Sequence, residues 1–499
     1  MKKNEAIDFS IPQRQSILAI IFIVLKFLRA FVGQAWILII PIVMGRGSST
    51  GGWETWELAA AGMGVFSTIW SVIAYFRYYY SLTDTELVIK KGILKKSDIN
   101  VPYERIQSVN FKQNFLHQML NVAEVAIDTA GSGEKEIQID ALSLENAKKL
   151  RSEILKRKKK EVSDTVLDGD ENLEEVENIL TLSTSDLFKI GLTQNHFKPV
   201  GLIIGLIFSS FAYSWQLDLD PQDIFKNIYT FLEDRSFLQS IIIAFLLIVF
   251  SVLYSIVTTF LNHANLTFFR NEDKFQLNQG LLTRKEVAAV DKKIQYISWG
   301  QNILQRLLGF HKLSFQQAGA NAVKQKVKNN FKIPGCTEDK IDFVKKEWLG
   351  KLNYAQSFES VSIHYFYYSF RWIIGLFSIA IAVNLYFYRI KTAIVLTAIM
   401  IYATYITWLS YKKKKYSINS DQLQISGGGL GFSHLLMPTF KIQNVAMTQS
   451  PYQWRRKLAS LRIYTAAGSL EIPFISEQRA AALMDKLLYE VERSKKAWM

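Results

Sequence analysis

The sequence predicts a multi-pass α-helical membrane protein that carries three cytoplasmic β-rich domains, each closed by a C-terminal helix. Three observations lead to this fold class. Long apolar runs occur in pairs, the polar regions between the pairs repeat one residue pattern, and basic residues gather on one side of the runs. The length of 499 residues agrees with about three units at roughly 150 residues per domain.

The apolar residues are concentrated in six uncharged runs. A helix needs roughly 17–25 residues to cross a hydrocarbon layer of ~30 Å, and five of the runs are that long. Buried helices of a soluble protein are the alternative, but these runs lack a polar face. The runs are Ala30–Gly45, Leu58–Phe76, Pro199–Leu217, Ser236–Asn262, Trp372–Tyr388 and Thr392–Tyr411.

A further apolar stretch precedes the first run. We interpret residues 14–28 as an interfacial helix, because Lys26 and Arg29 can extend their charged ends to the lipid headgroups. No small-x-small cleavage site follows this stretch, so the segment is not expected to be a cleaved signal peptide. The first membrane helix pair with its interfacial helix is therefore expected over residues 14–77.

The charges around the runs predict the orientation. Four lysines, Lys412–Lys415, follow the sixth run directly, whereas the loop Gln216–Arg235 holds five acids against two bases. Basic residues stay on the cytoplasmic side of bacterial membranes. We therefore expect an inner-membrane protein with both termini and all three long polar regions in the cytoplasm, although Arg389 and Lys391 at the third hairpin tip go against this trend.

The three polar regions repeat one pattern at two fixed offsets. The first contains Gly92, Arg105-Ile-Gln107, Gln113 and Thr129-Ala-Gly131. The second copy follows 188 residues later and the third 336 residues later, each with a basic-Ile-Gln step and a glutamine six residues after it. A single offset that aligns so many positions indicates an internal repeat.

Each copy has the pattern of short antiparallel strands followed by one helix. Hydrophobic residues alternate with polar ones near Leu87 and Val125, as in half-buried strands. Ser143, Thr337 and Ser476 stand where a helix N-cap is expected, and each has an acidic residue in the following turn. Periodicity alone therefore supports a small barrel or sandwich plus a helix.

The first copy resembles the bacterial PH-like (pleckstrin-homology-like) domain family of membrane proteins. The resemblance is carried by Tyr80-Ser-Leu-Thr-Asp84, Val101-Pro-Tyr-Glu-Arg-Ile-Gln-Ser-Val109, Gln113 and Thr129-Ala-Gly131 after two membrane helices. It extends over nearly the whole chain as three tandem units, and it implies a PH-like β-barrel in each but no reaction. The second copy lacks the proline, and the third has Ala467 in place of the glycine, so the copies are not all expected to bind one ligand.

This pattern gives a division of the chain into seven segments. The predicted domains alternate with membrane helix pairs, and one acidic linker separates the first domain from the second pair. The segments after residues 14–77 are PH-like domain 1 (78–160), the linker (161–180), helix pair 2 (181–263), PH-like domain 2 (264–350), helix pair 3 (365–411) and PH-like domain 3 (412–495).

The composition excludes several site classes. The single cysteine, Cys336, rules out an intrachain disulfide or a cysteine zinc cluster, and the six histidines show no HExxH spacing. We predict no catalytic residue, metal ligand or cofactor, and no enzyme activity. The glycine-rich segment Gly427–Gly431 lacks the Lys-Ser/Thr of a phosphate loop, so we interpret it as a hairpin turn.

Two groups of basic residues are candidates for contact with lipid headgroups or partners. The repeated cation is Arg105, Lys293 or Lys441, and a solvated strand residue or a salt bridge is the alternative. The helix end Lys148–Lys160, which includes Lys158, Lys159 and Lys160, is followed by eight acids; a solvated helix terminus is its alternative. The repeated glutamines are interpreted as structural.

The formal charge of +15 is spread along a membrane protein without an aromatic groove, so we predict no nucleic-acid binding. The expected function is a non-enzymatic, membrane-anchored scaffold or interaction protein that presents its domains at the cytoplasmic face. Its expected partners are membrane lipids and other membrane or cytoplasmic proteins, and a homo-oligomer stays open. A lipid-handling or transport-associated protein is the alternative, although the runs contain no acid of the kind that ion-coupled transporters use.

Overall fold

A computed structural model describes residues 8–26, 52–93, 96–129, 137–163, 177–194, 201, 237–318, 331–350, 357–387, 390–419 and 421–494. The chain divides into two compact units, each described by itself. The first contains Met1–Leu173, Ser183–Leu266 and Asn278–Glu286, and the second contains Glu174–Leu182, Thr267–Leu277 and Val287–Met499. The chain therefore passes between the units inside the second repeat.

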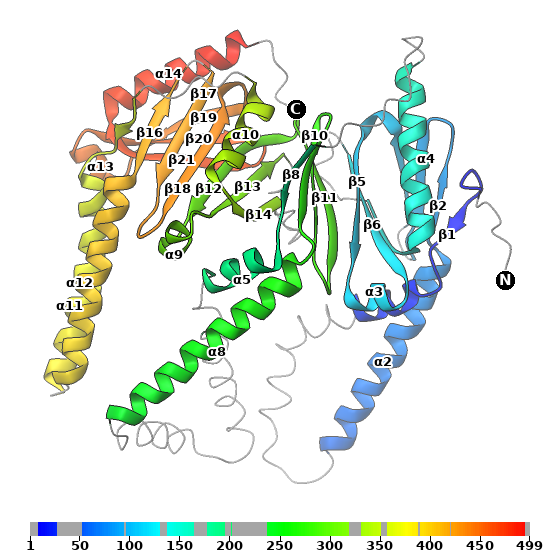
Figure 1. Cartoon of the computed structure of the whole chain (residues 1–499), viewed down its shortest axis with the longest axis horizontal. Coiled ribbons are helices and arrows are strands. Elements are labelled where there is room, and N and C mark those ends of the chain that lie inside the picture. The colour runs from blue at the N-terminus through cyan, green and yellow to red at the C-terminus, as the bar shows by residue number, and fades with distance from the viewer. Residues whose placement is uncertain are drawn as a thin grey trace. The chain divides into compact units, whose positions relative to one another are not determined.

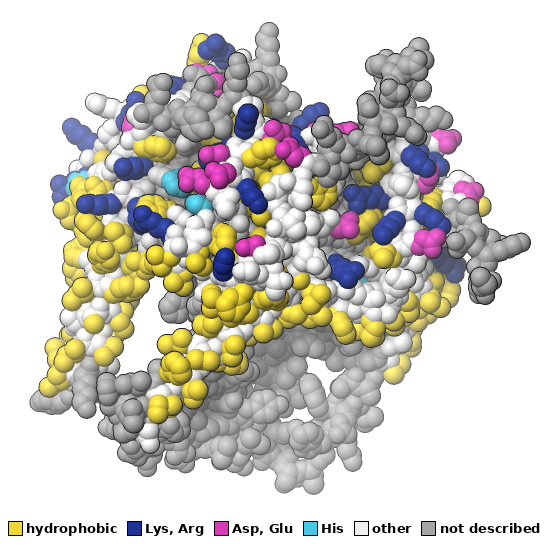
Figure 2. All heavy atoms as spheres, viewed as in Figure 1, with side chains coloured by type: hydrophobic (Ala, Val, Ile, Leu, Met, Phe, Trp, Pro, Cys, Tyr) yellow, Lys and Arg dark blue, Asp and Glu magenta, His cyan; other side chains and the backbone are white. Residues whose placement is uncertain are grey.

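Three described helices are long and apolar enough to cross a membrane, at Phe245–His263, His364–Tyr386 and Thr392–Lys413. They belong to α8 (Phe237–His263), α11 (His364–Tyr386) and α12 (Ile390–Lys413), and apolar side chains cover them in Figure 2. A shorter apolar stretch, Val65–Phe76, ends α2 (Gly52–Phe76). The predicted runs Ala30–Gly45 and Pro199–Leu217 lie outside the described residues, apart from Gly201.

The predicted interfacial segment is helical over residues 19–26 and lies against the first domain. The ring of Phe22 stacks on His117 at 3.7 Å between centroids, and Lys26 forms an ion pair with Asp140. Ile17, Ile21 and Leu25 are exposed at a spacing of four residues, which places them on one helix face. This helix therefore has one face on the domain and an apolar face turned outward, as an interfacial helix requires.

The first domain consists of two small antiparallel sheets and a C-terminal helix. Its core is formed by alternating residues of the strands and by the buried face of the helix, including Leu87, Ile127 and Leu150. The elements are β1 (Gln13–Arg14), β2 (Tyr79–Leu82), β3 (Glu86–Lys91), β4 (Ser97–Pro102), η1 (Tyr103–Arg105), β5 (Ile106–Gln113), α3 (Phe115–Met119), β6 (Val122–Thr129), β7 (Ile137–Ser143) and α4 (Leu144–Ser163).

The second domain repeats this order and has a core of four phenylalanines. Phe315 packs against Phe275 and Phe331, each 5.0 Å away between ring centroids. The helices α5 and α8, which precede β9 in the chain, pack against each other within the first unit. The elements are β8 (Glu177–Thr181), α5 (Thr184–Leu192), β9 (Thr267–Asn271), β10 (Lys274–Gln279), β11 (Arg284–Val290), β12 (Ile294–Gln301), α9 (Ile303–Leu307), β13 (His311–Gln317), β14 (Phe331–Cys336) and α10 (Glu338–Leu349).

The third domain follows α12 and has the same sequence of strands and helices. Figure 1 shows its last helix lying along the strands. That helix buries Ala480, Leu483 and Leu487 against the sheets. The elements are β15 (Glu359–Ser360), β16 (Lys415–Ile418), β17 (Gln422–Gly427), β18 (Phe432–Pro438), η2 (Thr439–Lys441), β19 (Ile442–Thr448), α13 (Pro451–Arg455), β20 (Leu458–Thr465), β21 (Gly468–Ser476) and α14 (Glu477–Arg493).

The predicted ends of the C-terminal helices agree with the structure. Thr337 and Ser476 are the N-caps of α10 and α14, and the Ser476 hydroxyl accepts a hydrogen bond from the amide of Arg479. The Ser143 hydroxyl accepts one from the amide of Asn146 at 3.3 Å. The two serine hydroxyls thus satisfy amides that have no partner within the helix, whereas the Thr337 side chain makes no such hydrogen bond.

The prediction of a closed β-barrel in each domain is corrected. The two sheets of each domain remain open, with β1-β2-β3-β4 forming one sheet and β19-β20-β21 another. The physical reason lies at the sheet edges: β18 hydrogen-bonds to β12 of the preceding domain. Each strand has only two edges, so a strand that binds the neighbouring domain cannot also close its own barrel.

Candidate functional site

The second and third domains are joined edge to edge by main-chain pairing. Within the second unit, β12 pairs antiparallel with β18 from Ile297 opposite Leu436 to Gln301 opposite Phe432. We call this contact seam 2–3. A Cβ atom added to Gly300 would lie 2.6 Å from the carbonyl oxygen of Phe432, so the two backbones approach more closely than a side chain allows.

An equivalent contact joins the first repeat to the start of β11 within the first unit. Gln113 lies opposite Arg284, and Phe111 lies opposite Glu286. We call this contact seam 1–2. Gln118 of α3 adds two hydrogen bonds, from its side-chain amide to the carbonyl oxygens of Leu281 and Leu282 at 3.0 and 2.9 Å.

The two seams have the same register. Gln113 and Gln301 occupy one repeat position, and Arg284 and Phe432 occupy another, so the pairs Gln113–Arg284 and Gln301–Phe432 are equivalent. Since a shift of one residue would reverse the side-chain faces, an identical register means that the same surfaces meet at both seams.

Side chains at the centre of each seam form a three-part stack. At seam 1–2, Arg151 of α4 lies over the Phe111 ring at 5.3 Å and forms an ion pair with Glu286 at 3.1 Å. At seam 2–3, Trp299 stacks on His434 at 5.5 Å between centroids, and Lys345 of α10 lies 4.2 Å over the Trp299 ring. Arg151 and Lys345 each follow the first residue of their helix by seven positions.

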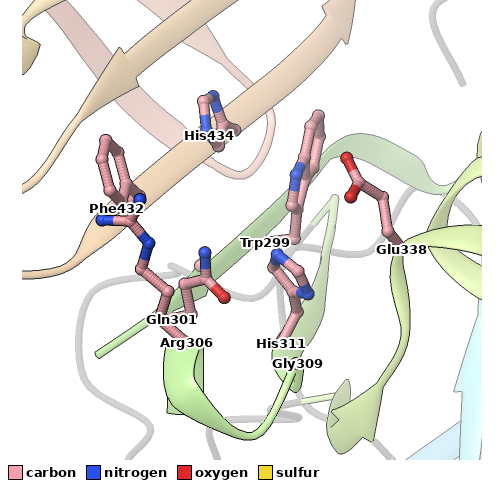
Figure 3. A pocket seen from close by; sticks show the side chains of 9 residues that line it. Trp299, Gln301, Arg306, Gly309, His311, Glu338, Phe432 and His434 are labelled. Atoms are coloured by element: carbon pink, nitrogen blue, oxygen red, sulfur yellow. The ribbon is translucent and has the colours of Figure 1, made fainter. Parts of the chain in front are cut away.

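Seam 2–3 also encloses a polar hollow of about 420 Å³ (Figure 3). Trp299 and Gln301 come from β12, His434 from β18, and Arg306 from α9, whose guanidinium lies 5.1 Å from the Phe432 ring. His311 and Glu338 complete the wall. Within the described ranges, no group of His, Cys, Asp and Glu residues is arranged to hold a metal ion.

Burial controls the two histidines of the hollow. It lowers the pKa of His434, and the positive charge of Lys345 lowers that pKa further, as would a proton on His311. Burial also lowers the pKa of His311, while Glu338 opposes this shift. Both imidazoles are therefore held in the neutral form more firmly than a free histidine is.

The hairpin turn predicted for Gly427–Gly431 lies at the same seam. It joins β17 to β18, and the ammonium of Lys413 donates hydrogen bonds to the carbonyl oxygens of Gly429, Leu430 and Gly431 at 2.6, 3.2 and 3.0 Å. Its carbonyl oxygens thus point at a cation, which is the opposite polarity to a phosphate loop.

The repeated cation occupies three different environments. Lys441 is 3% exposed, and its ammonium donates a hydrogen bond to the carbonyl oxygen of Lys292 in the preceding domain at 2.6 Å. Burial lowers the pKa of Lys441 to about 8. Lys293 is 5% exposed, whereas Arg105 at the end of η1 is exposed. Lys158, Lys159 and Lys160 are residues of the helix α4.

Two of the repeated glutamines have the structural role expected of them. The side-chain amides of Gln113 and Gln449 donate to the carbonyl oxygens of Val122 and Leu458, at 2.8 and 2.9 Å. These acceptors are again equivalent positions in the repeat. The glutamine therefore ties the end of one strand to the start of the next across the short helix between them.

Comparison with known proteins agrees with this threefold architecture. A family model for the bacterial PH domain matches residues 16–158, 224–352 and 372–491. The chain belongs to the bacterial PH domain family. The UPF0699 transmembrane protein YdbT of Bacillus subtilis (strain 168) is 23% identical to it over 437 residues, which cover 84% of this chain and 87% of that protein.

The stacks and the hollow between these bacterial PH domains were not predicted from the sequence. His311 and His434 are separated by an entire membrane helix pair, so no local spacing connects them. One signal was present: the aromatic residues Phe111 and Trp299 occupy the same repeat position. An aromatic residue maintained beside polar neighbours would have indicated a contact surface.

Proposed function

We propose that this bacterial PH domain protein is a non-enzymatic scaffold that is anchored in the cytoplasmic membrane and presents its edge-paired β-sheets to partners at the cytoplasmic face. The repeated seam is the observation that carries the proposal. The edge strands β5 and β12 each bind another strand through main-chain hydrogen bonds, and such edges recruit extended segments of other chains by the same chemistry.

The short helices at the domain rims support a position against the lipid surface. The helices α3, α9 and α13 occupy one repeat position, and each exposes large apolar side chains, including Met119, Leu307 and Trp454. Exposed apolar clusters on a folded domain indicate a contact with a membrane or a partner.

Aromatic contacts join the third domain to its membrane helix. The Tyr452 hydroxyl and the Nδ1 atom of His364 are 3.0 Å apart, and Arg371 lies over the rings of Tyr368 and Tyr452 at 4.3 and 5.1 Å. His364, Tyr368 and Arg371 lie at the start of α11, and Tyr452 lies in α13. Aromatic rings favour the membrane interface, so these contacts support a third domain held beside the bilayer.

Crosslinking in native membranes tests the proposal. The full chain carries an affinity tag, and bound proteins are identified after crosslinking, solubilisation and capture; a tagged membrane protein of similar size is the control. A specific protein partner, including another copy of the chain, is the expected result. No enriched protein, together with a changed lipid composition in a deletion strain, would overturn the scaffold and support the lipid-handling alternative.

A further inference from the structure

Two edge strands of the described sheets are the repeat counterparts of the strands that pair at the seams. The strand β4 is last in the sheet β1-β2-β3-β4, and β19 is last in the sheet β19-β20-β21. They are the two halves of a seam, because β4 corresponds to β11 and β18, while β19 corresponds to β5 and β12. Among the described strands, one strand from each side of a seam is therefore left without a seam partner: β4 and β19.

The two existing seams predict the register in which these edges would pair. Both place Gln449 opposite Lys96, Thr448 opposite Ser97 and Met447 opposite Asp98. The longer seam 2–3 extends this register to Ala446 opposite Ile99 and Val445 opposite Asn100. The two seams thus predict the same opposing residue at each position that both of them include.

Over the residues that this register pairs, Val445–Thr448, the β19 edge lacks the features that normally prevent edge-to-edge association; the irregularity in its pairing with β20 lies between Ile442 and Asn444. Its residues Ile442–Thr448 include no charged residue and no proline. Soluble edges are usually protected by lysine, proline, a bulge or a covering element. Asp98 on β4 and Lys96 directly before it are exposed and charged, so the two edges differ in chemistry and do not favour pairing with themselves.

Side chains beside the edges fit the same interface. Gln118, Arg306 and Trp454 share one repeat position; the first two contact the neighbouring domain, and Trp454 is 69% exposed. At seam 2–3, Arg306 lies over Phe432, whose repeat equivalent is Lys96. In that register Trp454 and Lys96 would form the same cation–π pair with the two roles exchanged.

We propose that a second copy of this chain binds head to tail, with β19 of one chain pairing with β4 of the next in the register of the two internal seams. This inference rests on the proposed scaffold function and names its partner. Because the two surfaces differ, the contact is heterologous and forms a closed ring or a row of chains. Arg105, which is exposed in the single chain, would take the place at the new seam that Lys441 takes at seam 2–3.

Disulfide trapping in membranes tests the register directly. One full-length chain carries S97C and a first tag, and a co-expressed chain carries T448C and a second tag. Directly opposite residues of an antiparallel pair are close enough for a disulfide. The native Cys336 does not interfere, because it is buried and burial raises the pKa of its thiol to about 12.

The matched control replaces S97C by N100C, which moves the thiol about 10 Å along the strand. We expect at least ten times more crosslinked dimer from S97C with T448C than from N100C with T448C. Equal yields or the absence of a dimer would each overturn the proposal. A further chain carries S97C and T448C together, and a disulfide that forms only within that single chain would also overturn it.

If the cysteine variants are expressed poorly, a second variant tests the same interface by measuring self-association. Trp454→Ala removes an exposed side chain and should lower the yield of self-association in detergent at least fivefold, while Tyr489→Ala on the outer face of α14 should leave it unchanged. Unchanged association of the Trp454→Ala protein would contradict the interface. If capture recovers a different protein and no second copy, the scaffold stands and this partner is wrong.

Discussion

Seams 1–2 and 2–3 share a backbone register but differ in side-chain chemistry. At seam 1–2 a carboxylate, Glu286, pairs with Arg151 over a phenyl ring, whereas at seam 2–3 a neutral imidazole, His434, stacks on Trp299. Gly300 permits close backbone approach at seam 2–3, and the equivalent residue of seam 1–2 is Lys112. The comparison shows that the repeat fixes the geometry, while each seam has acquired its own means of stabilisation.

The largest effect is expected from Gly300→Ala. Its new Cβ atom would meet the Phe432 carbonyl oxygen, so β12 and β18 must separate, at a cost of about 1–3 kcal/mol in the free energy of unfolding. Thermal unfolding of the purified protein measures this cost. Gly427→Ala is the control, since its nearest contacts lie at an ordinary 3.5 Å. Equal stability of the two variants would show that seam 2–3 does not constrain this backbone.

A smaller effect is expected from Arg151→Ala, which removes an ion pair and a cation–π contact from seam 1–2. Both partners are partly exposed, so the loss should be about 1 kcal/mol and should shrink at high salt. Limited proteolysis near β11 measures the opening of the seam. Lys149→Ala on the same helix is the control, because its ion pair with Glu145 lies outside the seam. Equal cleavage of the two variants would contradict this assignment.

The pH dependence should also distinguish the seams. The pKa values of His434 and His311 are lowered in the folded protein, so the unfolded state binds more protons and stability falls as the pH drops below about 6.5. Hydrogen exchange of β18 between pH 7.5 and pH 5 measures this loosening. His434→Gln should flatten the change. If the His434→Gln variant keeps the same pH response, His434 is not the cause of the loosening.

The smallest effect is expected from rebuilding the open edge. Met447 and Met484 occupy the positions that Phe111 and Arg151 occupy at seam 1–2, and Asp98 corresponds to Glu286. The double change Met447→Phe, Met484→Arg should therefore strengthen head-to-tail association about twofold, as measured by dilution of the purified protein in a light-scattering or mass-based assay. Adding Asp98→Asn should cancel the gain; a gain that persists in the triple variant would exclude this mechanism.

Much of the fold could be predicted from sequence because its determinants are local. Apolar runs such as Trp372–Tyr388 and the N-caps Thr337 and Ser476 depend on neighbouring residues, and α11, α10 and α14 confirm them. The threefold repeat was also visible at fixed offsets, and the family match follows it. Alternation predicts which face of a strand is buried, so the strands were identified as well.

The seams could not be predicted, because alternation says nothing about the partner at a strand edge. Arg105 and Lys441 share one sequence pattern, yet one is exposed and the other is buried against Lys292. The difference arises at the seams: Lys441 meets the preceding domain at seam 2–3, whereas β4, which leads to Arg105, is an edge strand of its sheet among the described strands. The closed barrels were incorrectly predicted for the same reason, since the closing edges bind neighbouring domains.

Lys413 connects the apolar helix α12 to seam 2–3. It ends α12, and its ammonium holds three carbonyl oxygens of the turn that starts β18. The next residue, Phe432, is the last partner of β12 at seam 2–3. A displacement of α12 along or about its axis would therefore move the end of seam 2–3 itself.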